Sequence, residues 1–347
     1  MQKVIDLWNA NGVETKHAVA CLTHLFDRSD DVPPLIDQQL FQKHAPDLLP
    51  RMLTAVAPAG PGPGIAHTCD AAQRAAIYTA LGTFAQHRFG NASDIELQLM
   101  DAVLGALDDG SSEVRGVVLP AMGNCAAIYW NLIERPQELT TFFEKAVGKV
   151  YTVISNQNPL FLSSHKSMSD ALRAFGHLIR LVPNIENVKS VKGESLDLET
   201  VTDCLLGRLS KLDNAVKQRC AANAAFALGS IYDSPRDLQG NLPTHIRVMN
   251  ELSTTVAEAE FARLRVSALA ALAHAPASVW ERVGYEERMH AWRNLILACK
   301  TPLKERKGKF KQVSADQVAQ FNRSFAKWMY SLLNVIQKDD VDEIFKV

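Results

Sequence analysis

The chain has 347 residues, 47% of them hydrophobic, and a formal net charge of −1. This charge gives no overall attraction to nucleic acid or anionic membranes, and no stretch approaches the roughly 18 apolar residues of a membrane span. The start of the chain lacks the long apolar run of a signal peptide, and six isolated cysteines without a Cys-x-x-Cys pair disfavour a disulfide framework or a zinc site. We therefore expect a soluble protein of a reducing compartment, cytoplasmic, nuclear or both.

Apolar residues recur with helical spacing along the chain and predict an all-α fold of about seven helical pairs without strands. The first pair, 4–10 and 13–26, lies in an irregular amino-terminal segment, 1–45. The regular repeats span 46–275, with expected pairs 46–57 and 69–87, 93–107 and 113–132, 138–154 and 166–181, 198–210 and 215–232, and 245–257 and 260–274. The segment 276–347 holds helices 285–300 and 315–337 around a basic loop at 300–311. The whole chain, 1–347, is expected to form a single α-solenoid.

Several local signals support these boundaries. Ser93 and Glu96 fit a capping box at the start of one helix. Pro120 falls inside a helical pattern and predicts a kink that does not end the helix. The Ala-Gly-Pro-Gly-Pro-Gly stretch at 59–64 predicts a non-helical insertion; its prolines lack the amide donors of a phosphate loop, and no Lys-Ser/Thr follows.

A ten-residue window ending in a small residue occurs five times, which is the most informative feature of the sequence. The five windows are Gln73–Gly82, Val114–Gly123, Ser167–Gly176, Cys220–Gly229 and Leu264–Ala273. Their last residues are spaced by 41, 53, 53 and 44 positions, a period typical of solenoids built from helical pairs. Small residues on one helical face let a neighbouring helix approach closely, and we expect Gly229 at the tightest point of such a contact.

These windows resemble the second helix of the HEAT repeat, Val-Arg-x-x-Ala-Ala-x-Ala-Leu-Gly. Val114-Arg115 and Leu264-Arg265 carry the opening pair, and Arg74 matches its second position, whereas Met168 and Ala221 depart from it.

Two segments, Asn223–Ile231 and Asp170–Leu178, resemble a narrower group, the HEAT repeat-containing protein 6 family. The resemblance is to the carboxy-terminal part of that family and covers about residues 66–336 of this chain. The resemblance implies an armadillo-like helical scaffold for protein–protein interaction, without a known reaction, catalytic residue, cofactor or metal. Members of that family are longer than this chain, which leaves open a further amino-terminal array.

The arginines at the repeated position, Arg74, Arg115 and Arg265, have two interpretations. In the first they form a structural ladder with turn aspartates; the suitable partners are Asp70, Asp109 and Asp213. In the second they line a concave surface and bind an acidic ligand.

Two groups of residues have spacings that suggest a metal, but neither is complete. Glu287 and His290 have the Glu-x-x-His spacing of half a di-iron site, which needs a second copy and two more carboxylates. His17, Cys21 and His24 share a helical stretch without a fourth ligand for a tetrahedral site. We expect an amphipathic face and ordinary histidines at these positions.

The segment 300–311 holds six basic residues and one acidic residue among its twelve. The candidate interaction residues are Lys304, Arg306, Lys307, Lys309 and Lys311. A solvated loop between helices is one interpretation, and a nuclear localisation signal or phosphate-contacting loop is the other.

The first expected function is a non-enzymatic scaffold that binds a protein partner on the concave surface of stacked second helices. The alternative is a nucleic-acid-associated or nuclear-transport role through the loop 300–311. Val4, Ile5, Leu7 and Trp8 predict an exposed apolar edge at the amino-terminal end, covered by further repeats or a partner.

Overall fold

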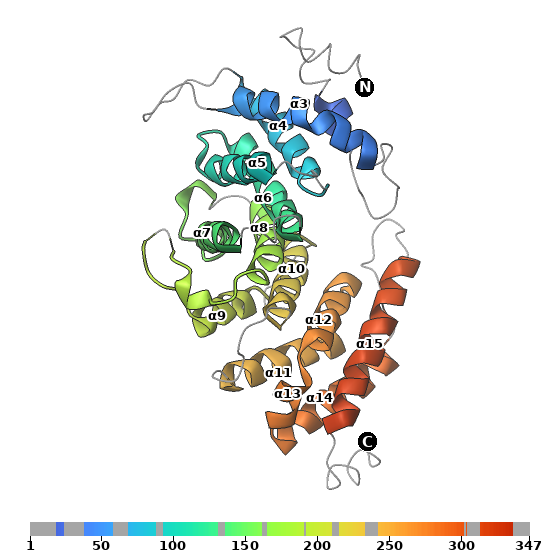
Figure 1. The fold of residues 1–347 in the computed structure, drawn as a ribbon. Coiled ribbons are helices and arrows are strands. Elements are labelled where there is room, and N and C mark those ends of the chain that lie inside the picture. Colours follow the sequence, from blue (N-terminus) through green and yellow to red (C-terminus); the bar gives the residue numbers. More distant parts are fainter. Residues whose placement is uncertain are drawn as a thin grey trace. The chain divides into compact units, whose positions relative to one another are not determined.

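The structure is a computed structural model, and in its described part every regular element is a helix (Figure 1). The described residues are 19–23, 38–57, 69–87, 93–130, 136–161, 165–190, 192–209, 215–232, 242–301, 303 and 313–335. Within these ranges there is no β-strand, and Lys189 and Ser195 form an isolated antiparallel bridge. No helix among them combines the length and apolar content needed to cross a membrane. The all-helical expectation is confirmed for this part of the chain.

The residue contacts group the chain into two units, Met1–Val150 and Tyr151–Val347, with the boundary inside one helix. The helices of the first unit are α3 (Gln38–Val56), α4 (Ala71–Phe84), α5 (Ser93–Gly105), α6 (Ser112–Asn124) and most of α7 (Pro136–Ile154). In this unit α3 contacts α4 and α5, while α4 lies along α6. The helices thus form consecutive pairs, each pair with a first helix and a second helix.

The second unit continues the alternation of first and second helices. Its helices are α8 (His165–Ile179), α9 (Leu198–Leu209), α10 (Ala215–Tyr232), α11 (Leu242–Glu258), α12 (Ala262–His274), α13 (Ala277–Arg282), α14 (Tyr285–Lys300) and α15 (Ala315–Val335). The second helices α8, α10, α12 and α15 contact one another in series, as Figure 1 shows. The first helices form a second series, in which α11 contacts both α9 and α14. The result is a repeat-like arrangement of two helical layers.

The predicted boundaries agree closely with several helices and are wrong at others. Helix α10 occupies the predicted range 215–232, whereas α3 begins at Gln38, eight residues before the predicted start at Pro46. Pro46 and Pro50 lie inside α3, where each removes one backbone hydrogen bond. Burial of Leu48, Leu49 and Met52, all at most 2% exposed, stabilises the helix across this interruption.

Three further differences concern short elements. The short helix α13 lies where no helix is predicted, and Trp280 anchors it at 1% exposure. After α6, the chain continues through Cys125–Trp130 as a 3₁₀-helix rather than as α-helix. Helix α6 runs through Pro120 to Asn124, as expected.

The first predicted pair lies outside the described residues, apart from a helical stretch at 19–23. The apolar edge predicted at Val4–Trp8 also lies outside them, as do His17 and His24 and the insertion at 59–64. The side chain of Ser93 is not described either, so its capping box stays a prediction. A capping box is present at α4 instead, where Asp70 and Gln73 accept hydrogen bonds from each other's backbone amides.

Candidate functional site

The second helices meet through the small residues that end the repeated windows. A Cβ placed on Gly82 of α4 would lie 2.7 Å from Cα of Ala121 on α6. A Cβ on Gly229 of α10 would lie 2.7 Å from Cα of Ala271 on α12. Real Cβ atoms do not approach backbone this closely, so both glycines are required by the helix spacing.

Helices α8 and α10 show the same contact with an aromatic neighbour. A Cβ on Gly176 would lie 2.6 Å from the Phe226 ring and 3.1 Å from Cα of Ala227. Nearer the start of both helices, Asn223 Nδ2 donates to the Ser169 carbonyl oxygen at 2.7 Å and lies 3.0 Å from the Ser169 Oγ. Because residue numbers rise together along both helices, α8 and α10 run parallel. The other two window ends, Gly123 on α6 and Ala273 on α12, are buried.

Asn223 is a structural residue that the sequence analysis did not single out. It is 4% exposed, and its amide satisfies a backbone carbonyl that faces another helix. In the first unit, Asn124 Nδ2 donates to the Gly82 carbonyl oxygen at 3.1 Å. In the sequence, the sign of this role is that Asn223 is a polar residue within an otherwise alanine-rich window.

Arg74 forms the ion pair expected of the structural ladder. Its Nε and Nη2 donate to the two carboxylate oxygens of Asp109 at 3.1 and 3.0 Å, and Nη1 donates to the Cys69 carbonyl at 2.9 Å. The side chains of Arg74 and Asp109 are 10% and 4% exposed. Burial raises the pKa of the adjacent Tyr78 to about 12, with the charge of Asp109 as a second cause. The pair fixes α4 to the turn before α6.

Arg115 and Arg265 bind backbone carbonyls through the hydrogen bonds that are resolved. Arg115 Nη1 donates to the Asp109 carbonyl oxygen at 2.6 Å. Arg265 donates to the carbonyls of Val256 at 2.8 Å, Ala298 at 3.2 Å and Thr301 at 2.9 Å, near the ends of α11 and α14. Helix ends carry carbonyls without intrahelical partners, so Arg265 stabilises two helix ends at once.

The burial of these arginines bears on the alternative that they bind an acidic ligand. Arg74, Arg115 and Arg265 are 8%, 7% and 1% exposed. Of the expected aspartate partners, Asp70 caps α4 and Asp213 lies outside the described residues. The geometry of the three arginines therefore fits a structural role and leaves little surface for a ligand.

The second predicted interaction site, the basic loop, is not described. Lys304, Arg306, Lys307, Lys309 and Lys311 all lie in the range 304–312, outside the described residues. Lys300, at the end of α14, is described and exposed.

The Glu287–His290 pair is not part of a ligand cluster. Among the described residues, no three His, Cys, Asp or Glu side chains gather closely enough to hold a metal ion. His290 Nε2 instead lies 3.1 Å from Thr254 Oγ1 and 3.0 Å from Asn294 Nδ2. The contact with Thr254 joins α11 to α14, and the contact with Asn294 lies within α14, so His290 has a packing role.

The six cysteines are free thiols, and the most buried are poor nucleophiles. Burial raises the pKa of the Cys125 thiol to about 12. Burial also raises the pKa of Cys204 and Cys220, and the nearby Arg208 only partly opposes this. A thiolate is the reactive form, so none of these three is prepared for nucleophilic chemistry.

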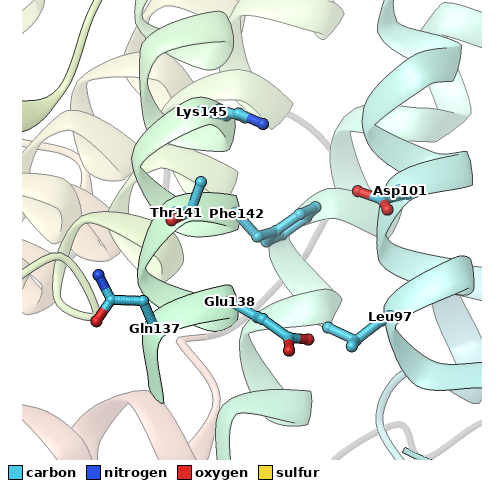
Figure 2. A pocket seen from close by; sticks show the side chains of 7 residues that line it. All are labelled: Leu97, Asp101, Gln137, Glu138, Thr141, Phe142 and Lys145. Atoms are coloured by element: carbon cyan, nitrogen blue, oxygen red, sulfur yellow. The ribbon is translucent and has the colours of Figure 1, made fainter. Parts of the chain in front are cut away.

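A pocket of about 340 Å³ lies between the first helices α5 and α7. The residues that line it are Leu97, Asp101, Gln137, Glu138, Thr141, Phe142 and Lys145. In Figure 2, Glu138, Phe142 and Lys145 extend from α7 toward α5. Glu138 and Lys145 are both exposed, so a charge there would be screened by water. This pocket offers a small apolar surface beside solvated charges, without a shielded acid, base or nucleophile.

His177 on α8 should remain neutral to an unusually low pH. Its ring centroid lies 4.9 Å from that of Phe226, and burial lowers its pKa to about 4, with Arg173 and Arg180 as further causes. In the unfolded chain the histidine pKa has its ordinary value of 6.5, so the folded state binds fewer protons between about pH 4 and 6.5. The free energy of unfolding should therefore rise with pH across this window.

Histidine NMR titration and urea unfolding at several pH values test this prediction. The His177→Gln variant should lose this contribution to the pH dependence, while the other histidines keep theirs. A titration midpoint near 6.5 for His177 in the folded protein would contradict it.

No family model matches the chain, and no curated protein matches it. Two crystal structures of engineered proteins are similar over most of its length. One is 12% identical, with 96% of each chain covered and a TM-score of 0.39. The other is 12% identical, with 99% of this chain and 96% of that chain covered and a TM-score of 0.28. Likenesses at these scores support no conclusion about fold family or function.

Proposed function

We propose that the chain is a non-enzymatic α-solenoid of the HEAT-repeat type that binds a protein partner on its second helices. The in-register contact of α8 with α10 and of α10 with α12 carries this proposal. A series of parallel helices presents a continuous surface, and solenoids use such concave surfaces to hold partners. The narrower relationship, to the HEAT repeat-containing protein 6 family, and a cytoplasmic or nuclear location are part of the same proposal.

The chemistry of the described residues supports a binding role over catalysis. Arg74, Arg115 and Arg265 donate hydrogen bonds to backbone carbonyls, and Arg74 also pairs with the buried Asp109. The cysteines with shifted pKa values are buried or half-buried. A solenoid repeat contacts its neighbours only, so distant residues rarely converge into a water-excluding pocket.

The proposal is tested by mapping where captured partners protect the chain. The tagged chain, residues 1–347, is incubated with cell extract at two salt concentrations, with and without nuclease, and hydrogen exchange is measured on the purified complex. Protection on α8, α10 and α12 that survives nuclease is expected. Protection confined to the first helices α9, α11 and α14 would contradict the proposal, and loss of all partners with nuclease would favour the nucleic-acid alternative instead.

A further inference from the structure

Three exposed arginines lie on three consecutive second helices. Arg173 lies on α8, Arg219 on α10 and Arg263 on α12, and all three side chains are exposed. Each stands in the amino-terminal part or middle of its helix, and parallel packing in register brings these parts together. They differ from Arg74, Arg115 and Arg265, which are buried and form hydrogen bonds inside the protein.

The guanidinium groups of Arg173 and Arg219 are close enough to act on that of Arg263. Burial and the charges of Arg173 and Arg219 lower the pKa of Arg263, and no carboxylate is among the causes. Arg173 Cζ lies 5.3 Å from the centroid of the half-buried Phe226 ring, which belongs to α10. The arginine on one helix therefore reaches across to its neighbour.

The remaining charges on these helices leave the surface strongly cationic. Lys166 on α8 and Arg180 just after its end add positive charge, and His177 between them is neutral at pH 7 because burial lowers its pKa to about 4. Asp170 is the acidic group among them, and Lys166 and Arg219 act on it. The first turns of α8, α10 and α12 contain no acidic residue, so the partial positive charge of these helix ends adds to the same potential.

We propose that Arg173, Arg219 and Arg263, with the Phe226 ring beside Arg173, form a recognition surface for an extended acidic peptide segment of a protein partner. This inference rests on the proposed binding function and names the partner's chemistry. Guanidinium groups bind carboxylates with paired hydrogen bonds, which suits them to side chains of Asp and Glu. Phe226 supplies a flat apolar contact next to Arg173.

The spacing of the helices sets the length of the segment. Packed helices lie about 8–10 Å apart, so the axes of α8 and α12 are separated by roughly 16–20 Å, and this is the longest span needed because the charge of Arg173 already acts on Arg263. An extended chain advances about 3.3 Å per residue, so about five or six residues cross this distance. Carboxylates two or three residues apart would meet successive arginines.

A peptide-binding experiment tests this surface on the full chain. The probes are a fluorescein-labelled 12-residue peptide rich in Asp and Glu, its Asn and Gln counterpart, and a 12-nucleotide single strand, measured by anisotropy at two salt concentrations. The triple variant Arg173→Ser, Arg219→Ser, Arg263→Ser should bind the acidic peptide at least tenfold more weakly. The control variant Lys192→Ser, Arg282→Ser, Lys300→Ser removes three exposed cations elsewhere in the second unit and should change affinity less than twofold.

A second measurement places the peptide on the surface. Bound carboxylates next to His177 should raise the pKa of its imidazole above the value in the free protein, and the triple variant should not show this rise. The inference is overturned if the triple and control variants bind alike, or if the oligonucleotide depends on the three arginines more strongly than the peptide does. If a partner still protects α8, α10 and α12 while the acidic peptide fails to bind, the proposed function stands and only this inference falls.

Discussion

Replacing Asp109 with Ala should lower the free energy of unfolding of the first unit by about 3–5 kcal/mol, because it leaves the buried Arg74 guanidinium without its counter-charge. Arg74 donates to both carboxylate oxygens of Asp109, and the same carboxylate accepts the Ser111 amide at 2.8 Å. The substitution thus removes the two hydrogen bonds that hold α4 to the turn before α6 and a third within that turn. Urea unfolding, with hydrogen exchange of α4 and α6, measures the loss.

The adjacent Asp108 provides a matched control. Its carboxylate lies 2.5 Å from Lys149 Nζ, but its side chain is 64% exposed. Exposed pairs of this kind contribute about 0–1 kcal/mol, so Asp108→Ala should change stability little. The double variant Arg74→Met, Asp109→Ala should lose less than the two single variants together, because no charge is left stranded. Equal unfolding midpoints for the two aspartate variants would defeat this account.

The repeated windows made the helical pairing predictable, because their small residues report on contacts between helices. Gly82, Gly176 and Gly229 each sit where a neighbouring helix leaves no room for a side chain. Other boundaries depend on tertiary packing. Prolines are local signals against a helix, yet α3 continues through Pro46 because the apolar face around it is buried.

The roles of the arginines were only partly predictable from the repeat pattern. Arg74 and Asp109 form a pair that the ladder anticipated. Arg265 occupies the equivalent window position but binds carbonyls at the ends of α11 and α14, which no spacing rule specifies. The sequence of one helix does not determine which carbonyls of the neighbouring helices its arginine will contact.

The exposed arginines show a second limit of sequence reasoning. Arg173, Arg219 and Arg263 are separated by 46 and 44 residues, and each alone is an ordinary surface residue. Arg219 and Arg263 each come immediately before their windows, whereas Arg173 is the seventh residue of its window, so the repeat does not align all three. They come together only because α8, α10 and α12 pack in parallel, and the register of those contacts is a tertiary property.

Replacing Gly229 with Leu should destabilise the second unit by about 3 kcal/mol, the upper end of the usual range for overpacking. The first added atom, Cβ, would already lie 2.7 Å from Cα and 2.8 Å from Cβ of Ala271. The contact is with backbone, which cannot rotate away as a flexible side chain would, so α10 and α12 must separate. Each repeat is stabilised by its neighbours, so faster hydrogen exchange should extend beyond α12 into α15.

Gly207 of α9 is the matched glycine for this experiment. It is exposed, and a Cβ placed on it meets nothing within 4 Å. Gly207→Ala should therefore raise stability by up to about 1 kcal/mol, because alanine is the better helix former. Gly229→Ala should lower stability despite the same gain in helix propensity, and Ala271→Gly in that background should recover part of the loss. If Gly229→Ala stabilises the protein as Gly207→Ala does, the contact between α10 and α12 is looser than described.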